Sequence, residues 1–194
     1  MIADSIPWKE ELWRVARNLE RRKTQARWTA RSGFLVERDT MTAAYAIRKL
    51  IEAHKLSDEV RAEQIPAQRH VLIGDPVDFW SRDKFIEHYD MENPENVTLS
   101  LINLCNQIIH SLIWMRSMDG ESMRFDGIFV CSDRARKQHV YFIHVDSLIE
   151  TFRSVANDDI VTLQMQRDAQ GDMHVIKASR SHDEMPPSWG LLPD

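Results

Sequence analysis

Four polar side chains interrupt the most apolar stretch of the sequence, residues 97–115, at a spacing that could support chemistry. If this stretch is one helix, a narrow strip on it carries Asn103, Asn106, Gln107 and His110, because spacings of three, four and seven residues share a helix face. Leucine and isoleucine fill most of the remaining circumference, which predicts a buried helix. Buried amides and imidazoles need hydrogen-bond partners. The strip should therefore face a hydrogen-bond network, a dimer interface or a hydrated site.

In a hydrated site, His110 would act as a general acid or base, because histidine titrates near neutral pH. Asn106 would orient the imidazole or bind substrate, and Asn103 and Gln107 would add binding contacts. In a network or an interface, the same side chains would instead fix how helices pack or align. The sequence leaves these interpretations open.

A second candidate surface is basic. Residues 14–31 contain seven arginines and lysines and one acid, Glu20, although the whole chain has a formal net charge of −5. On a helix predicted for residues 7–31, the side away from the apolar stripe carries arginines with interleaved tryptophans: Trp13, Arg14, Arg17, Arg21, Trp28 and Arg31. Such a mixture suits RNA phosphates and bases, and it equally suits a protein interface or a solvated face.

The elements that would position these residues indicate an α+β fold. Residues 1–120 are predicted to form a bundle of four or five helices, with helices at 7–31 (ended by Ser32-Gly33), 38–54, 56–60, 81–89 and 97–115. Two short apolar runs around a charged turn predict an antiparallel hairpin at 127–145, and alternating apolar residues predict another at 160–178, with a helix between the two. The parts are thus a helical part (1–120), a small antiparallel sheet packed on it (121–180) and an irregular tail (181–194).

Composition excludes several classes of protein. The chain has 194 residues with 43% hydrophobic and 28% charged residues, which is ordinary for a globular fold. Cys105 and Cys131 lie in apolar stretches and predict buried, reduced thiols. We see no metal-ligand spacing, no phosphate-binding glycine loop, no signal peptide and no uninterrupted membrane span. These features favour a cytoplasmic bacterial or phage-related protein without cofactor, metal or membrane.

The residues around His110 resemble a known motif. Residues 104–111, Leu-Cys-Asn-Gln-Ile-Ile-His-Ser, resemble the ribonuclease motif of the HEPN superfamily, small helical domains common in bacterial toxins and antiphage systems. That motif is an arginine, a polar residue that is often asparagine, three more residues and a histidine. Asn106 and His110 match it, whereas Cys105 occupies the arginine position. In active members the arginine stabilises the scissile phosphate, which a neutral thiol does not do. The resemblance therefore implies a degenerate member, and inactive members are thought to be binding or assembly modules.

Two functions follow from these observations. The first is a non-catalytic HEPN-like protein that forms a homo-oligomer or joins a larger bacterial complex, with phage defence as the setting that the resemblance suggests. The second is a metal-independent RNA endonuclease or toxin in which His110 is the acid or base. The second needs an arginine near His110, and Arg48 and Arg116 are the ones to examine.

Overall fold

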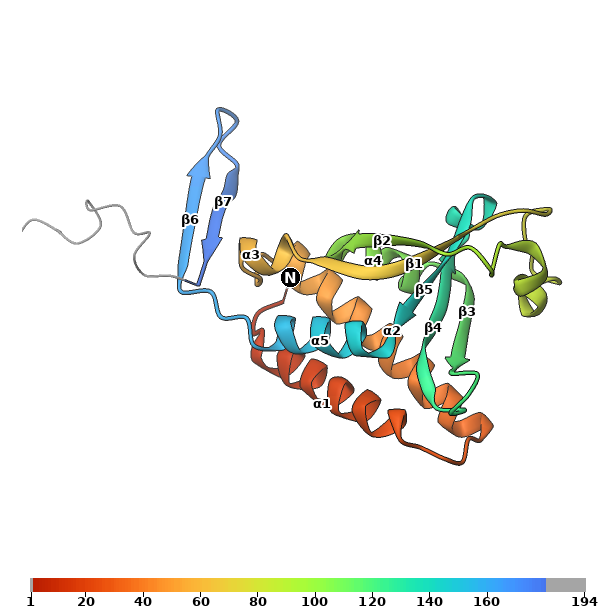
Figure 1. The fold of residues 1–194 in the computed structure, drawn as a ribbon. Helices are drawn as coiled ribbons and strands as arrows, with labels where there is room; N and C mark the ends of the chain where they lie inside the picture. The colour runs from red at the N-terminus through yellow and green to blue at the C-terminus, as the bar shows by residue number, and fades with distance from the viewer. Residues whose placement is uncertain (1, 181–194) are drawn as a thin grey trace, which may run out of the picture.

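A computed structural model describes residues 2–180 of the protein, and its fold is α+β as predicted (Figure 1). A five-stranded antiparallel sheet packs against the helices, and a separate two-stranded hairpin follows it along the chain. The helices are α1 (Ile6–Lys23), α2 (Ala30–Glu52), the short α3 (Asp58–Arg61), α4 (Leu101–Ile109) and α5 (Val145–Ala156), with 3-10 turns η1 (Arg82–His88) and η2 (Ala135–Lys137). The strands are β1 (Gln64–Val71), β2 (Glu95–Ser100), β3 (Ser111–Met118), β4 (Phe125–Ser132), β5 (His139–His144), β6 (Thr162–Arg167) and β7 (Met173–Ser179). The tail predicted for 181–194 lies outside the described residues.

The main sheet has the strand order β2-β1-β5-β4-β3, and all neighbouring strands are antiparallel. The hairpin predicted at 127–145 is confirmed, because Gly127 lies opposite His144 and Val130 opposite Tyr141. The second hairpin is confirmed as β6 and β7. Strands β1, β2 and β3 precede residue 120, so the sheet draws on both parts of the chain.

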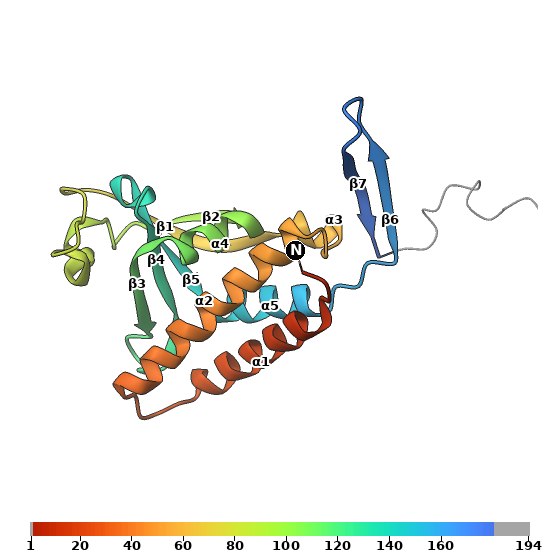
Figure 2. The same ribbon diagram turned by 180° about the vertical axis from the view of Figure 1, so that it is seen from behind.

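The core lies between one face of the sheet and the helices. Leu12, Val15 and Leu19 of α1 are buried at helical spacing, and Ile128 and Val130 of β4 belong to the same cluster. Burying each such side chain stabilises the fold by about 1.5–3 kcal/mol. Figure 2 shows α1, α2 and α5 on the same side of the sheet. The apolar sides of these helices therefore cover one face of the sheet and bury it.

The long first helix predicted for 7–31 is wrong, because α1 ends at Lys23 and α2 begins at Ala30. Thr29 starts α2 as its N-cap, with its hydroxyl accepting a hydrogen bond from the Ser32 backbone N–H at 3.2 Å. The predicted break at Ser32-Gly33 therefore lies inside α2. A Cβ atom on Gly33 would lie 2.7 Å from Nη1 of Arg116, so this glycine makes room for the arginine.

The long helix predicted for 97–115 is also wrong. This stretch is the end of β2, the nine-residue α4 and most of β3. Ser100 caps α4 by accepting from the Asn103 backbone N–H at 3.4 Å, and His110 is its C-cap. The prediction failed because a run that is apolar at most positions fits the helical period and the strand period alike.

The β6–β7 hairpin stands away from the sheet, beyond α3 (Figure 1). The fully buried residue Asp158 forms hydrogen bonds to several segments at this end of the fold. It accepts from the backbone N–H and the hydroxyl of Ser57, each at 2.7 Å, and from Nε of Arg180 at 2.6 Å. The side chain of Lys9 donates to the Asp158 carbonyl. One residue thus links α1, the cap of α3 and the end of β7.

Candidate functional site

The polar strip of α4 does not form one buried network. Asn103 and His110 are exposed, whereas Asn106 and Gln107 are half-buried. Gln107 accepts from the backbone N–H of Ser132 at 2.9 Å and so fixes the end of β4. The four side chains therefore divide into two that bond to the fold and two that face solvent within this chain.

The two arginines considered for His110 differ in position. Nη1 of Arg48 donates to the side-chain oxygen of Asn106, one helical turn before His110, while its Nε pairs with Glu52 at 2.8 Å. The guanidinium of Arg116 instead lies 4.6 Å from the ring centroid of Trp28. Arg48 therefore contacts a residue of the HEPN-like motif, whereas Arg116 contacts Trp28. Within residues 2–180, the imidazole of His110 makes no hydrogen bond or ion pair.

Both cysteines are free and buried, as predicted. Burial raises the pKa of the Cys105 thiol to about 12, although the nearby charge of Arg48 opposes this shift. Burial likewise raises the pKa of Cys131 to about 12. Both thiols are therefore protonated at neutral pH and do not act as nucleophiles.

The residues predicted to form one basic helix face lie in three places. Arg14, Arg17 and Arg21 are on α1, but Trp28 lies in the connection after α1 and Arg31 is on α2. The indole N–H of Trp13 donates to Asn157 at 3.2 Å, on the side of α5. The prediction of a single face is wrong because the chain turns between residues 24 and 29.

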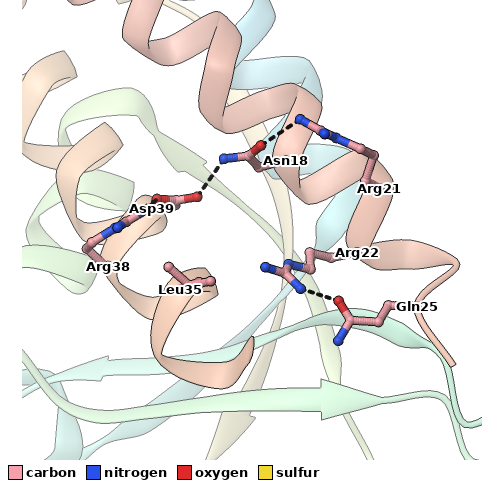
Figure 3. A pocket seen from close by; sticks show the side chains of 7 residues that line it. All are labelled: Asn18, Arg21, Arg22, Gln25, Leu35, Arg38 and Asp39. Atoms are coloured by element: carbon pink, nitrogen blue, oxygen red, sulfur yellow. Dashed lines mark hydrogen bonds and ion pairs between the residues drawn. The ribbon is translucent and has the colours of Figure 1, made fainter. Parts of the chain in front are cut away.

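That turn brings α1 and α2 together around a polar pocket, a cavity of about 280 Å³. The pocket is lined on one side by residues of α1 and of the segment just after it, namely Asn18, Arg21, Arg22 and Gln25. On the other side it is lined by Leu35, Arg38 and Asp39 of α2. Figure 3 shows the Arg22 side chain reaching across the gap from α1 toward Leu35. Of this set, only Arg21 was predicted as a site residue. The spacing of residues 18, 21, 22 and 25 indicates one face of a helix. No feature of the sequence indicated that α2 would lie opposite that face.

A buried carboxylate organises one wall of the pocket. Asp39 accepts from Nδ2 of Asn18 at 2.9 Å and from Nη2 of Arg38 at 2.6 Å, with Arg14 at 3.4 Å. Burial pushes the pKa of Asp39 upward, but the hydrogen bonds from Arg38 and Asn18, with the charge of Arg14, outweigh it and lower this pKa. Asp39 is therefore ionised and fully paired at neutral pH.

The other wall holds arginines without a counter-charge. Nη2 of Arg21 donates to Oδ1 of Asn18 at 2.9 Å, and Nη1 of Arg22 donates to the side-chain oxygen of Gln25. Neither arginine pairs with a carboxylate within residues 2–180. The pocket therefore presents two unneutralised guanidinium groups.

A third feature was not predicted as a site. Residues 73–86, here called the tip, project from the end of the sheet (Figure 1) and expose four large apolar side chains. The exposed fractions are 68% for Ile73, 57% for Phe79, 87% for Trp80 and 57% for Ile86. The segment lacks the regular spacing that would have marked it in the sequence.

The tip is nevertheless firmly built. The Asp78 carboxylate accepts from the backbone N–H groups of Trp80 and Ser81, both at 2.8 Å, and from the Ser81 hydroxyl at 2.9 Å. The rings of Phe79 and Trp80 meet edge to face at 5.4 Å, and Arg82 stacks on Phe79 at 4.2 Å. These contacts hold two aromatic rings in solvent.

A small second core fixes the tip to the sheet. Val77, Phe85 and Tyr89 are buried with Ile113 and Cys131. The Tyr89 hydroxyl donates to the carbonyl of Arg136 at 2.8 Å, and Arg136 in turn donates to the carbonyl of Val77. The exposed rings are therefore presented from an anchored base.

Comparisons with protein-family models, curated proteins and solved structures find no significant match to this chain. Among residues 2–180, no cluster of three or more histidine, cysteine or acidic side chains is placed to hold a metal ion. No helix in the same part of the chain is both long and apolar enough to cross a membrane.

Proposed function

We propose that this is a non-catalytic, cytoplasmic interaction protein that joins a larger assembly, and that the tip contacts a protein partner. The observation that carries the proposal is Trp80, an 87% exposed tryptophan in a loop held in shape by Asp78. Single exposed apolar residues are ordinary on protein surfaces, but a cluster of them marks an interaction site. Tryptophan is also among the residues that contribute most to protein interfaces.

Preorganisation supports a binding role. A loop that must be ordered on binding loses conformational entropy, which weakens the complex. The Asp78 hydrogen bonds and the buried side chain of Phe85 already fix the tip before any partner arrives. The rings of Phe79 and Trp80 can therefore insert into a partner at low entropic cost.

The charges around the tip indicate the chemistry of the partner. Asp75, Asp83 and Glu87 are exposed, and none of them forms an ion pair within the described chain. The bases of the same segment are Arg82, which stacks on Phe79, and the exposed Lys84, so acidic groups are in excess. Complementary charge at the rim of an interface speeds association and selects the partner. We therefore expect an apolar pocket with a basic rim on the partner.

The resemblance of residues 104–111 to the HEPN motif agrees with an assembly role, because inactive members of that superfamily are thought to act as such modules. It also suggests phage defence as the setting. Homo-oligomers and larger complexes both fit the proposal.

The test is photo-crosslinking in cells of the source organism, with p-benzoylphenylalanine replacing Trp80 or, as control, Tyr45. Tyr45 is an exposed aromatic on α2. We expect a discrete protein adduct from position 80 alone, and its loss when Phe79→Ser and Ile86→Ser are added. The adduct mass shows whether the partner is a second copy or another protein. The same adducts from both positions, or none from position 80, would contradict the proposal.

One observation favours the second candidate, an RNA endonuclease: Arg48 reaches Asn106 beside His110. In this alternative, His110 transfers the proton and Arg48 binds the scissile phosphate. Arg48 would have to leave Glu52, which now holds its Nε. The candidate predicts that His110→Ala abolishes RNA cleavage while the protein stays folded. Normal cleavage by that variant would exclude a catalytic role for His110.

A further inference from the structure

We infer that the pocket between α1 and α2 binds a small phosphate-bearing ligand, with its phosphate held by Arg21 and Arg22. This site is separate from the tip and independent of the function proposed above. It rests on the charge, the hydrogen-bond donors and the volume of the cavity, whose lining side chains are drawn in Figure 3.

The balance of charge is the first argument. Three guanidinium groups line the cavity, and among residues 2–180 the only carboxylate there is that of Asp39. Asp39 is already satisfied by Arg38 of α2 and by Asn18 and Arg14 of α1, and it forms no ion pair with Arg21 or Arg22. Two positive charges on adjacent residues of α1 are left in a concave site. Such an arrangement is unfavourable by itself and becomes favourable when an anion enters.

The available donors are the second argument. A guanidinium group has five N–H donors in a planar fork, a geometry that matches phosphate oxygens. Arg22 uses one nitrogen on Gln25, and Arg21 bonds to Asn18 and, weakly, to the carbonyl of Arg17 at 3.4 Å. Both keep N–H groups for a ligand. The contacts with Gln25 and Asn18 fix the orientation of the two guanidinium groups.

A phosphate suits this site better than a carboxylate. A phosphate monoester carries a charge of about −1.5 to −2 at pH 7 and offers three strong acceptor oxygens. It would neutralise both unpaired arginines, whereas a carboxylate would neutralise one. The cavity of about 280 Å³ exceeds the phosphate itself, and Leu35 supplies an apolar wall for the organic part.

We expect a cavity of about 280 Å³ to hold the end of a ligand rather than a continuous chain. Binding at the pocket should therefore depend on a terminal phosphate. Long RNA would instead bind along exposed arginines outside the cavity, including Arg17, with a steep dependence on salt.

The test is NMR titration of the full-length, ¹⁵N-labelled protein with glycerol 3-phosphate, with glycerol as the matched ligand control. We expect saturable shifts confined to residues near the pocket, and none with glycerol. Arg22→Gln should weaken binding about tenfold or more, because a charge-assisted hydrogen-bond donor is lost. Arg22→Lys should bind with intermediate affinity, since it keeps the charge but not the fork.

Arg17→Gln is the matched control variant, because Arg17 is an exposed α1 arginine that does not line the cavity. Its affinity should equal that of the wild type, and circular dichroism should show that all variants are folded. Shifts that do not saturate, or equal weakening by Arg17→Gln and Arg22→Gln, would overturn the proposal. So would tighter binding by an RNA oligonucleotide without terminal phosphates at sites outside the pocket, together with no response to glycerol 3-phosphate.

Discussion

The amide of Asn18 on α1 donates to the carboxylate of Asp39 on α2 at 2.9 Å, and this hydrogen bond joins the two helices beside the pocket. Asn18→Leu would leave one oxygen of a buried carboxylate without its donor. We expect the free energy of unfolding to fall by about 1–3 kcal/mol, measured by urea denaturation. Arg17→Gln, an exposed neighbour on the same helix, should change it by less than about 0.5 kcal/mol. Equal effects of the two variants would show that the bond adds no stability.

The paired state of Asp39 also predicts a dependence of stability on pH. Its pKa is lower in the folded than in the unfolded protein, so the unfolded chain binds more protons in acid. The stability that this group contributes is complete above the usual aspartate pKa of about 4 and is lost as the pH falls through the lower folded pKa. Denaturant melts of wild type and Asp39→Asn from pH 6 to pH 2 should therefore converge in acid. A difference that stays constant over this range would refute the ionised, paired Asp39.

The sequence predicted these elements unequally, and particular residues explain why. The hairpin at 127–145 consists of two short apolar runs around a charged turn, and the one at 160–178 alternates in hydrophobicity, so short-range pattern alone located both. The sequence singles out the polar residues near His110 as unusual, and in the structure two of them bond to the fold and two face solvent. Their helix was overextended, because the cap at Ser100 is a single residue within a continuous apolar run.

The pocket was missed for a different reason. It depends on where α1 ends, and no proline or glycine marks the turn after Lys23. The predicted break at Ser32-Gly33 lies inside α2, where a Cβ atom on Gly33 would lie 2.7 Å from Nη1 of Arg116, a residue distant in sequence. Arg22 and Asp39 therefore line the same pocket through tertiary packing, which overrides local signals. No local pattern could have placed them together.

Asp158 should be among the most sensitive positions for stability. It is fully buried and accepts hydrogen bonds from Ser57 and Arg180. Asp158→Ala leaves the buried donors of Ser57 without an acceptor and breaks the ion pair with Arg180, whose side chain is 44% exposed. We expect the lost hydrogen bonds to lower the free energy of unfolding by about 1–3 kcal/mol. The neighbouring acid Asp159 has a side chain that is 93% exposed, and Asp159→Ala is the matched control. Thermal melts that rank the two variants equally would contradict this role.

Gly127 offers the sharpest test of the sheet. A Cβ atom there would lie 2.4 Å from the carbonyl oxygen of Ile143 and 2.7 Å from the ring of Phe142, so the neighbouring strand β5 would have to move. Overpacking of this kind costs about 1–3 kcal/mol, and Gly127→Ala should lower the midpoint of chemical denaturation accordingly. Adding Phe142→Leu should recover only part of the loss, because the contact with the Ile143 backbone remains. Gly120→Ala is the control, since a Cβ atom there meets nothing within 4 Å. If Gly127→Ala is as stable as Gly120→Ala, β4 and β5 are not packed as closely as the structure shows.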